Sequence, residues 1–338
     1  MKAAFYNGNK SITVQENAPV PPKAGEIQIQ VAYAGLCGTD LHIYLGHMDK
    51  RVTFPQIMGH EMSGVVHAVG EGVTGFTVGD PVTVMPLHPC GECPACNAGH
   101  SHICQNLKFL GIETPGAFQS YWTVPAFTVL HLPKGLSLQH GALVEPLAVA
   151  CHDVRLGEVK QGDYAVVLGG GPIGTLIALV AREAGAKVLV SEINPYRLEL
   201  LAELGLETIN PKEDSIVDRV QQATDGAGAD IVFEVTSSAV GAELMTQLPR
   251  TRGRIVVVAI FSEPVKVDLH RFFWRELKLC GARVYEREDF QSAIDLAASG
   301  KLALDRIITG TYPLAEAEKG FQQMENGGKA MKILLSCS

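Results

Sequence analysis

The chain has 338 residues, of which 46% are hydrophobic and 19% charged, a composition that excludes a disordered chain and predicts two domains. Its formal net charge of -8, with no cluster of lysines and arginines, argues against a nucleic-acid partner. Residues 1–22 lack the apolar core of a secretory signal, and no apolar run reaches the roughly 18 residues of a membrane helix. We therefore expect a cytoplasmic protein with no membrane partner.

The first part of the chain, to about residue 150, has the pattern of strands joined by turns. Residues 26–33 (EIQIQVAY) alternate with a period of two, and residues 62–68 include adjacent β-branched side chains. Glycine-rich turns follow, and a Gly-Asp-Pro turn precedes the short apolar run at 82–85. This pattern predicts an all-β module, either a barrel or a sandwich.

Three short segments of this part carry metal-binding side chains. They are Cys37 in CGTDLH, His60 and Glu61 in GHE, and Glu145 in EPL near the predicted domain boundary. Cys37 and His60 with one or two of these glutamates would leave a coordination position for water or a substrate oxygen, as a catalytic zinc requires. Taken singly, Cys37 fits a core cysteine and His60 a satisfied polar residue. Asp40 is either a turn residue or a partner for the second ring nitrogen of His60.

The eight cysteines are unevenly distributed, with four scattered along the chain and four in one short segment. In a reducing compartment, clustered thiols more often hold a metal than form disulfides. Four thiolates fill a tetrahedral shell, so this segment predicts a closed, structural zinc site. Its ligands are Cys90, Cys93, Cys96 and Cys104.

From about Tyr164 strands and helices alternate, which predicts βαβ units and a parallel sheet. The expected strands are 164–168, 187–191, 230–234 and 254–259, and the expected helices are 172–184, 195–204 and 239–248. Two further helices, near 289–299 and 314–325, and a last strand at 330–335 complete the chain. We expect an α/β protein, and the strand at 254–259 offers an edge for pairing between subunits.

The segment GGGPIG follows the first of these strands and opens a helix, as a dinucleotide-binding turn requires. Gly169 permits the tight turn, Gly171 lets the backbone approach a pyrophosphate, and Gly174 lets the helix pack closely on the sheet. Pro172 and Ile173 begin that helix, whose N-terminus supplies free N–H groups to the phosphates.

The second strand ends at Glu192, about twenty residues further on, as the nucleotide motif requires. A carboxylate there binds both hydroxyls of the adenosine ribose and repels a 2′-phosphate, which predicts NAD. Arg197 is the main argument for NADP, since it can serve a 2′-phosphate, although an exposed helix arginine also explains it.

In this order, CGTDLH, GHE, the four cysteines, EPL and GGGPIG resemble the medium-chain zinc alcohol dehydrogenases over essentially the whole chain. The similarity is greatest to the polyol branch, which includes sorbitol, butanediol, sugar-acid and threonine dehydrogenases. It implies a GroES-like, β-rich catalytic domain at 1–150 and 284–338, with a structural-zinc lobe at about 88–106. It also implies a doubly wound Rossmann domain at 151–283, two zinc ions per chain, NAD, and a homodimer or homotetramer.

By this resemblance Cys37 and His60 match the catalytic zinc ligands, and Glu61 matches a glutamate that binds the zinc directly or moves on and off it. Glu145 stands where many simple alcohol dehydrogenases have a cysteine. Polyol dehydrogenases also have glutamate there, which favours a polyhydroxy substrate. Cys90, Cys93, Cys96 and Cys104 match the structural zinc ligands without departure.

The expected reaction is reversible oxidation of a secondary hydroxyl of a polyol, sugar or sugar acid to a ketone. Thr39 is expected to accept the alcohol proton and pass it through the cofactor ribose, and His42 to carry it to solvent. An L-threonine 3-dehydrogenase-like activity is the alternative, and a non-catalytic nucleotide-binding scaffold is a third. Pocket candidates are Tyr44, Phe109 and Arg283, for which core packing or an internal ion pair is the competing explanation.

Overall fold

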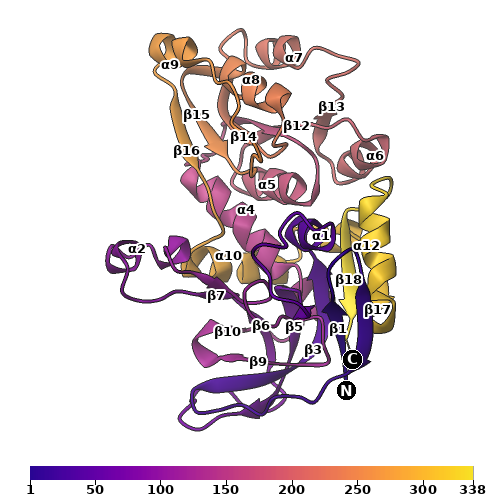
Figure 1. The fold of residues 1–338 in the computed structure, drawn as a ribbon. Helices are drawn as coiled ribbons and strands as arrows, with labels where there is room; N and C mark the ends of the chain where they lie inside the picture. The colour runs from indigo at the N-terminus through magenta and orange to yellow at the C-terminus, as the bar shows by residue number, and fades with distance from the viewer. Residues whose placement is uncertain (338) are drawn as a thin grey trace. The chain divides into compact units, whose positions relative to one another are not determined.

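The computed structural model describes residues 1–337, which divide into two compact units. The first contains Met1–Pro146 and the segment from Glu286 onward, and the second contains Leu147–Tyr285. Figure 1 shows the elements of each unit by their labels. Within the described residues, no helix combines the length and the apolarity that a bilayer crossing needs.

The first unit is built on a seven-stranded sheet with the order β10-β6-β5-β3-β18-β17, and β9 also pairs with β3. The C-terminal strand β18 therefore lies against β3 from the start of the chain, while β17 and β18 run parallel. Smaller sheets join β2-β1-β4 and β7-β8. The strands are β1 (Lys2–Tyr6), β2 (Ile12–Glu16), β3 (Glu26–Leu36), β4 (Gln56–Ile57), β5 (Glu61–Val69), β6 (Pro81–Val84), β7 (Leu87–His88), β8 (Lys108–Phe109), β9 (Tyr121–Pro125), β10 (Val129–His131), β17 (Ile308–Pro313) and β18 (Lys332–Ser336).

Short helices complete this unit. They are α1 (Gly38–Tyr44), α2 (Pro94–Asn97), α3 (Leu138–Gly141), α10 (Arg287–Ala298), α11 (Leu304–Ile307) and α12 (Ala317–Glu325). Helix α1 begins directly after β3 because Asp40 in its first turn accepts the backbone N–H of Cys37, at 2.9 Å. The cap fixes where the strand stops and the helix starts, and it places Cys37 at that junction.

The second unit is a six-stranded parallel sheet with the order β13-β12-β11-β14-β15-β16. Its strands are β11 (Tyr164–Leu168), β12 (Lys187–Ser191), β13 (Glu207–Ile209), β14 (Ala229–Glu234), β15 (Pro249–Val257) and β16 (Lys278–Gly281). Its helices are α5 (Pro172–Glu183), α6 (Pro195–Glu203), α7 (Ile216–Ala223), α8 (Ala239–Gln247) and α9 (Leu269–Arg275). The order reverses between β11 and β14, and a doubly wound sheet binds its nucleotide at that point.

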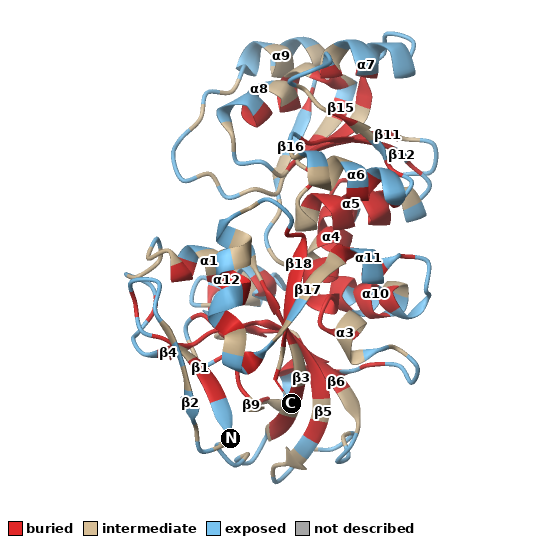
Figure 2. Cartoon of the chain, turned by 90° about the vertical axis from the view of Figure 1, so that its right-hand side faces the viewer, coloured by how far each residue is buried: buried red, intermediate tan, exposed pale blue. Residues whose placement is uncertain are grey.

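Burial explains why these strands form a sheet covered on both faces. All five residues of β11 are buried, and the central strands and helix α5 are red in Figure 2. Helix α4 (Val144–Leu156) joins the two units along the chain. Its sequence VEPLAVACHDVRL carries apolar residues around most of the helix circumference. The helix was not predicted because such a sequence shows no amphipathic pattern.

The predicted edge for subunit pairing was wrong. Strand β15, which contains residues 254–257, pairs with β14 on one side and β16 on the other, so it is internal. The edge of the sheet is β16, whose sequence KLCG is short and mostly exposed. That strand was not predicted because it lacks a run of alternating or β-branched residues.

Candidate metal and nucleotide sites

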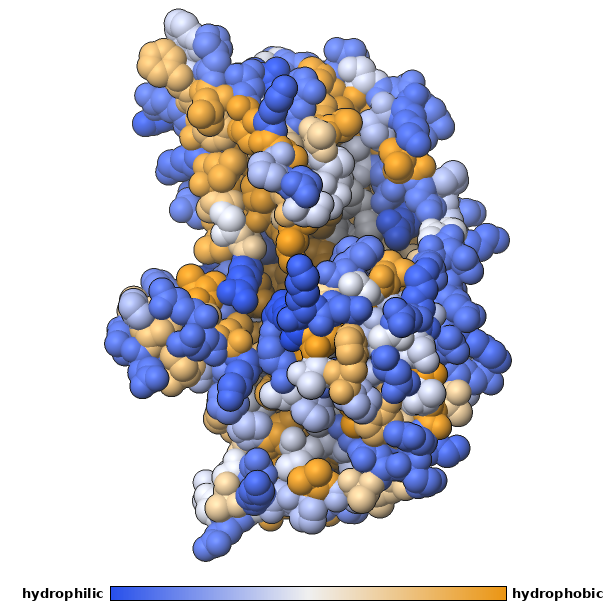
Figure 3. Space-filling model, in the orientation of Figure 1, coloured by the Kyte–Doolittle hydropathy of each residue, from blue (hydrophilic) through white to orange (hydrophobic). Residues whose placement is uncertain are grey.

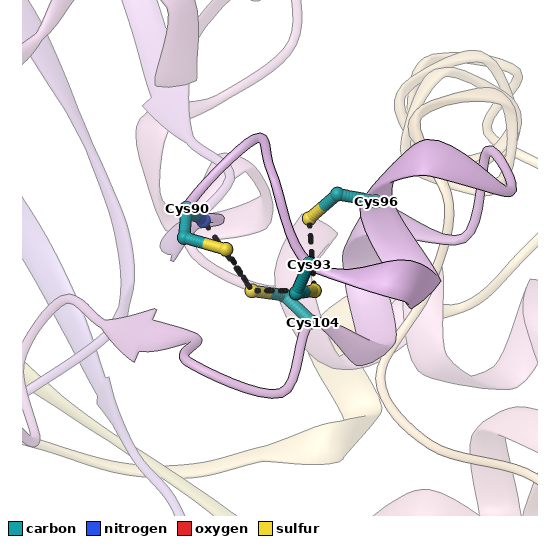
Figure 4. Close-up of side chains that lie close together, drawn as sticks. All are labelled: Cys90, Cys93, Cys96 and Cys104. Atoms are coloured by element: carbon teal, nitrogen blue, oxygen red, sulfur yellow. Dashed lines mark hydrogen bonds between the residues drawn. The ribbon is translucent and has the colours of Figure 1, made fainter.

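The four clustered cysteines converge on one point (Figure 4). Cys93 Sγ lies 3.5 Å from Cys96 Sγ and 3.7 Å from Cys104 Sγ, and Cys104 Sγ lies 3.4 Å from Cys90 Sγ. Sulfurs at the corners of a tetrahedron around zinc are about 3.8 Å apart, given Zn–S bonds of about 2.3 Å. The spacing therefore fits a zinc ion, and all eight cysteines have free thiols.

Backbone N–H groups favour the thiolate form of two of these ligands, Cys90 and Cys93, whose pKa values they lower. Hydrogen bonds from the N–H groups of Cys96 and Gln105 lower the pKa of Cys93 to about 6. Cys104 Sγ accepts the N–H groups of Cys90 and Asn106, each at 3.3 Å. Burial, with the neighbouring Cys93 thiol, instead raises the pKa of Cys96 to about 12, so that a metal that binds the lobe must displace the proton of this thiol.

The second group joins Cys37, His60 and Glu61, each of which offers one ligand atom within 4.8 Å of the others. Cys37 precedes α1, Glu61 is the first residue of β5 and His60 directly precedes that strand, and both His60 and Glu61 are buried. Soft sulfur, imidazole and carboxylate together make a donor set suited to zinc, and three protein ligands leave a position open. The structure thus brings these three residues together.

Asp40 lies between the two segments that supply these ligands. Its Oδ2 accepts the N–H of Cys37, and its Oδ1 lies 3.5 Å from Nδ1 of His60. Burial lowers the pKa of His60, but the charges of Asp40 and Cys37 outweigh burial and raise it well above its usual value. A carboxylate behind a ligand histidine orients its ring toward the metal, so Asp40 lies in the position expected of such a partner.

The ring of His60 also has an aromatic neighbour. Phe109 meets it edge-to-face, with the ring centroids 5.2 Å apart and the planes at 87°. The preceding residue, Gly59, has φ of +98°, and a β-carbon there would stand 2.4 Å from the Phe118 ring. Packing therefore fixes the orientation of the His60 ring. Phe109, a pocket candidate, packs against this metal-binding residue.

Lys332 was not predicted from the sequence, and it binds Glu61 directly. Its Nζ donates to both carboxylate oxygens, at 2.8 and 2.7 Å, and to the carbonyl of Leu36, at 3.3 Å. Burial lowers the pKa of Lys332, but the charges of Glu61, Cys37 and Glu145 outweigh it and raise the pKa. The sequence offered one signal for this contact, a lysine at the start of the apolar strand KILLS. A lysine that is buried with such a strand requires an anionic partner.

Glu145 lies in the first turn of α4 and is buried. It stands outside the compact group of Cys37, His60 and Glu61, although it is close enough for its charge to act on Lys332. The sequence predicts one or both of these glutamates as metal ligands, and the compact group in the structure contains Glu61.

The residues expected to move a proton lie on α1. Thr39 is half-buried in its first turn, and His42 follows three residues later and is exposed. Nδ1 of His42 lies 3.2 Å from Nδ1 of His47. Tyr44, a pocket candidate, is buried against Phe321 instead, with the rings stacked at 4.9 Å, which is core packing.

In the second unit GGGPIG forms the turn between β11 and α5. Gly169 has φ of +106°, Gly171 caps the helix, and Pro172 and Ile173 open it. A β-carbon on Gly174 would stand 1.8 Å from the carbonyl oxygen of Gly169, so only glycine allows the helix this close to the strand. The free N–H groups of the α5 N-terminus suit a pyrophosphate.

Backbone N–H groups hold the carboxylate of Glu192 beside this turn. The donors are Gly170 at 3.0 Å, Ile193 at 2.7 Å and Asn194 at 2.9 Å. Nη1 of Arg197 lies 3.6 Å from the same carboxylate, and its buried Nε has no hydrogen-bond partner among the described residues. Glu192 is thus fixed at the end of β12, where an adenosine ribose would meet it, whereas Arg283 is exposed elsewhere in the unit.

Comparisons with known proteins show the family to which the chain belongs. Residues 23–134 match the alcohol dehydrogenase GroES-like domain, and residues 172–299 match the zinc-binding dehydrogenase domain. The chain is 54% identical to 2-dehydro-3-deoxy-L-galactonate 5-dehydrogenase of Pseudoalteromonas atlantica, over 100% of this chain and 99% of that protein. It is 37% identical to L-threonine 3-dehydrogenase of Pyrococcus abyssi, over 98% and 94% of the two chains.

Among solved structures, 2R,3R-butanediol dehydrogenase from Bacillus subtilis superposes with a TM-score of 0.91. It is 32% identical, and the match covers 99% of each chain. The two domain types and their order along the chain are thereby confirmed. The chain belongs to the zinc-binding alcohol dehydrogenases with a GroES-like and a Rossmann domain, and zinc and a nicotinamide dinucleotide are its cofactors.

Proposed function

We propose that the protein oxidises a secondary hydroxyl of a 2-dehydro-3-deoxy sugar acid to a ketone, with NAD as the hydride acceptor. The observation that carries this substrate class is the 54% identity, over the full length, to an enzyme named for the 5-hydroxyl of 2-dehydro-3-deoxy-L-galactonate. The carbon named there bears a secondary alcohol, which is the group that this family's chemistry oxidises. The retained Cys37, His60 and Glu61 support catalysis over a scaffold role.

The residues of the first unit divide the work. Cys37, His60 and Glu61 would hold the zinc ion, which would supply Lewis-acid polarisation of the substrate hydroxyl. Asp40 orients the His60 ring, and Phe109 packs against it. The hydroxyl of Thr39 accepts the proton of the substrate alcohol and passes it on, and His42 delivers it to solvent.

The structure supports NAD over NADP through Glu192. Three backbone N–H groups hold its carboxylate, so it cannot turn away from an incoming 2′-phosphate without losing them. Nη1 of Arg197 lies 3.6 Å from this carboxylate, so the positive charge of Arg197 is partly neutralised by Glu192. A fixed anion at the ribose favours the cofactor with a free 2′-hydroxyl.

We also propose a cytoplasmic homo-oligomer. Free, clustered thiols suit a reducing compartment. Hydrophobic residues gather in Figure 3 over the region of α9, β15 and the edge strand β16, and Phe273 and Trp274 of α9 are 78% and 67% exposed. An exposed edge strand beside an apolar patch favours pairing with a second copy.

A substrate panel tests the proposed activity. The zinc-loaded protein is mixed with NAD and, in separate reactions, with 2-dehydro-3-deoxy-L-galactonate, sorbitol, 2R,3R-butanediol and L-threonine, and NADH absorbance is followed. We expect the highest kcat/KM with the sugar acid. Preference for L-threonine would support the activity of the other relatives instead, and no NADH from any alcohol would favour a scaffold.

A further inference from the structure

A second buried carboxylate lies beside the glycine turn of the second unit. Glu234 is the last residue of β14 and is 0% exposed, and its register partner on β11 is Leu168, which directly precedes Gly169. Glu192 directly follows β12, on the other side of β11. The turn that begins at Gly169 therefore lies between two carboxylates, of which the nucleotide motif predicts only Glu192.

The carboxylate of Glu234 binds the loop that follows its own strand. Its Oε1 accepts the backbone N–H of Thr236, at 2.9 Å, and the hydroxyl of the same residue. Its Oε2 accepts the backbone N–H of Ser237, at 3.3 Å. A β-carbon on Gly241 of α8 would stand 2.4 Å from Oε1, so glycine there leaves the space that the carboxylate occupies. A buried charge needs such donors, and these donors all come from one turn.

Ser237 has a backbone conformation that serine seldom adopts. Its φ is +53°, in the left-handed region that favours glycine because other side chains crowd the backbone there. Its hydroxyl donates to the carbonyl of Thr236, at 2.7 Å. The two N–H groups that Glu234 binds belong to the peptide bonds that lead into Ser237. The carboxylate thus offsets the free energy that the left-handed backbone costs.

This turn lies against the nucleotide motif. A β-carbon on Gly169 would stand 3.1 Å from Cγ2 of Thr236 and 3.6 Å from its backbone nitrogen. A doubly wound sheet binds its dinucleotide across the point where the strand order reverses, which here lies between β11 and β14. Since Glu192 on the β12 side is placed to meet the adenosine ribose, the β14 side is left for the nicotinamide half. Thr236 and Ser237, on the β14 side, are both exposed.

We propose that Glu234 is a positioning residue for the dinucleotide: it holds the turn of Thr236 and Ser237 in its left-handed conformation, and this turn forms the wall of the nucleotide site on the β14 side. Without the carboxylate, Ser237 is free to return to a negative φ, which turns the adjoining peptide groups and moves Thr236 relative to Gly169. The cofactor then meets a wall of different shape. The inference concerns cofactor binding and does not depend on which alcohol the protein oxidises.

Titration of the zinc-loaded protein with NADH, followed by NADH fluorescence, measures the effect without a turnover assay. In Glu234→Gln, which keeps the size of the side chain and removes its charge, we expect the NADH affinity to be about tenfold lower, the factor that one left-handed non-glycine residue represents. Ser237→Gly added to Glu234→Gln should restore the wild-type affinity, because glycine adopts a positive φ without strain. Arg252→Gly is the matched control. It also replaces a left-handed residue, with φ of +59°, but near the amino end of β15, and it should restore nothing.

Substitutions at Ser237 alone test the same role in a protein that keeps Glu234, and they decide the question if Glu234→Gln does not fold. Ser237→Val should weaken NADH binding, because a β-branched side chain disfavours the left-handed region. Ser237→Asn has a side chain of similar size that tolerates this region, so it should bind NADH as the wild type does.

Thermal unfolding of each cofactor-free variant separates cofactor positioning from a merely structural role. A structural role would lower the unfolding midpoint of Glu234→Gln and leave the NADH affinity of the folded protein unchanged. Wild-type NADH affinity in Glu234→Gln overturns the proposal, and so does a Glu234→Gln protein that Ser237→Gly does not rescue or that Arg252→Gly rescues. Equal NADH affinities in Ser237→Val and Ser237→Asn overturn it as well.

Discussion

Gly35 and Glu61 are directly opposite each other in the register of β3 and β5, and the carboxylate of Glu61 occupies the space where a side chain on Gly35 would begin. Oε2 of Glu61 would stand 2.2 Å from that β-carbon. One missing methyl group thus permits a buried ion pair between two distant strands. The same contact joins the backbone that precedes Cys37 to Glu61, which belongs to the other segment of the metal site.

Gly35→Ala is therefore expected to displace Glu61 and to destabilise the protein by about 1–3 kcal/mol, as overpacked buried sites are. Thermal unfolding and zinc content of the purified variant measure both effects. Gly38→Ala is the matched control, since nothing lies within 4 Å of a β-carbon there. Equal unfolding midpoints for the two variants would show that the carboxylate has room to move.

Cys104→Ser is expected to reduce the zinc content from two ions per chain to one while the Cys37 site stays loaded. The reason is that Cys104 Sγ lies close to the sulfurs of both Cys90 and Cys93, so its loss removes one of the four zinc ligands of this site. Elemental analysis after dialysis gives the count. Cys280→Ser, outside both groups, should keep two ions, and a Cys104→Ser protein that also keeps two would refute the four-sulfur site.

Glu192→Ala is expected to weaken NAD recognition by about 1.5–3 kcal/mol, the range for hydrogen bonds to a charged group, and to bring NADP closer to NAD in kcat/KM. The deletion also frees Arg197 from its ion pair, which favours a 2′-phosphate. Initial rates with both cofactors measure the change. Glu199→Ala, exposed on α6, is the control, and an unchanged NAD preference in Glu192→Ala would remove Glu192 from cofactor selection.

Thr39→Val is expected to lower turnover by about 10²–10⁴-fold, the contribution of a positioned proton-transfer group, while NAD still binds. Valine keeps the shape of threonine and removes its hydroxyl. Nucleotide binding is followed by NADH fluorescence and turnover by absorbance. Thr39→Ser should restore most of the rate, and wild-type turnover in Thr39→Val would exclude Thr39 from the mechanism.

The parts of the fold that could be predicted are those set by local sequence. Residues 164–168 and 187–191 form the strands expected of them, because buried parallel strands are continuous apolar runs between turns. The four cysteines within fifteen residues converge because short loops leave them little freedom. Helix α4 and strand β16 were missed, since neither shows the periodicity of its type.

The candidate site could be predicted only in part, because its geometry depends on contacts between segments that are far apart in the sequence. Cys37, His60 and Glu61 could be assigned by residue type and by resemblance, but their common location depends on the pairing of β3 with β5. Lys332 comes to Glu61 through the pairing of β18 with β3, a contact between opposite ends of the chain. No local pattern encodes such a pairing.

Isotope transfer is the most direct test of the central claim, that the protein moves a hydride from a secondary carbinol of a sugar acid to NAD. The zinc-loaded protein is incubated with NAD and 2-dehydro-3-deoxy-L-galactonate deuterated at C5, and both products are analysed by NMR and mass spectrometry. We predict one deuterium on the nicotinamide ring of the reduced cofactor and a new ketone at C5. A reduced cofactor without deuterium, or a sugar acid recovered unchanged beside active zinc-loaded protein, would contradict the account.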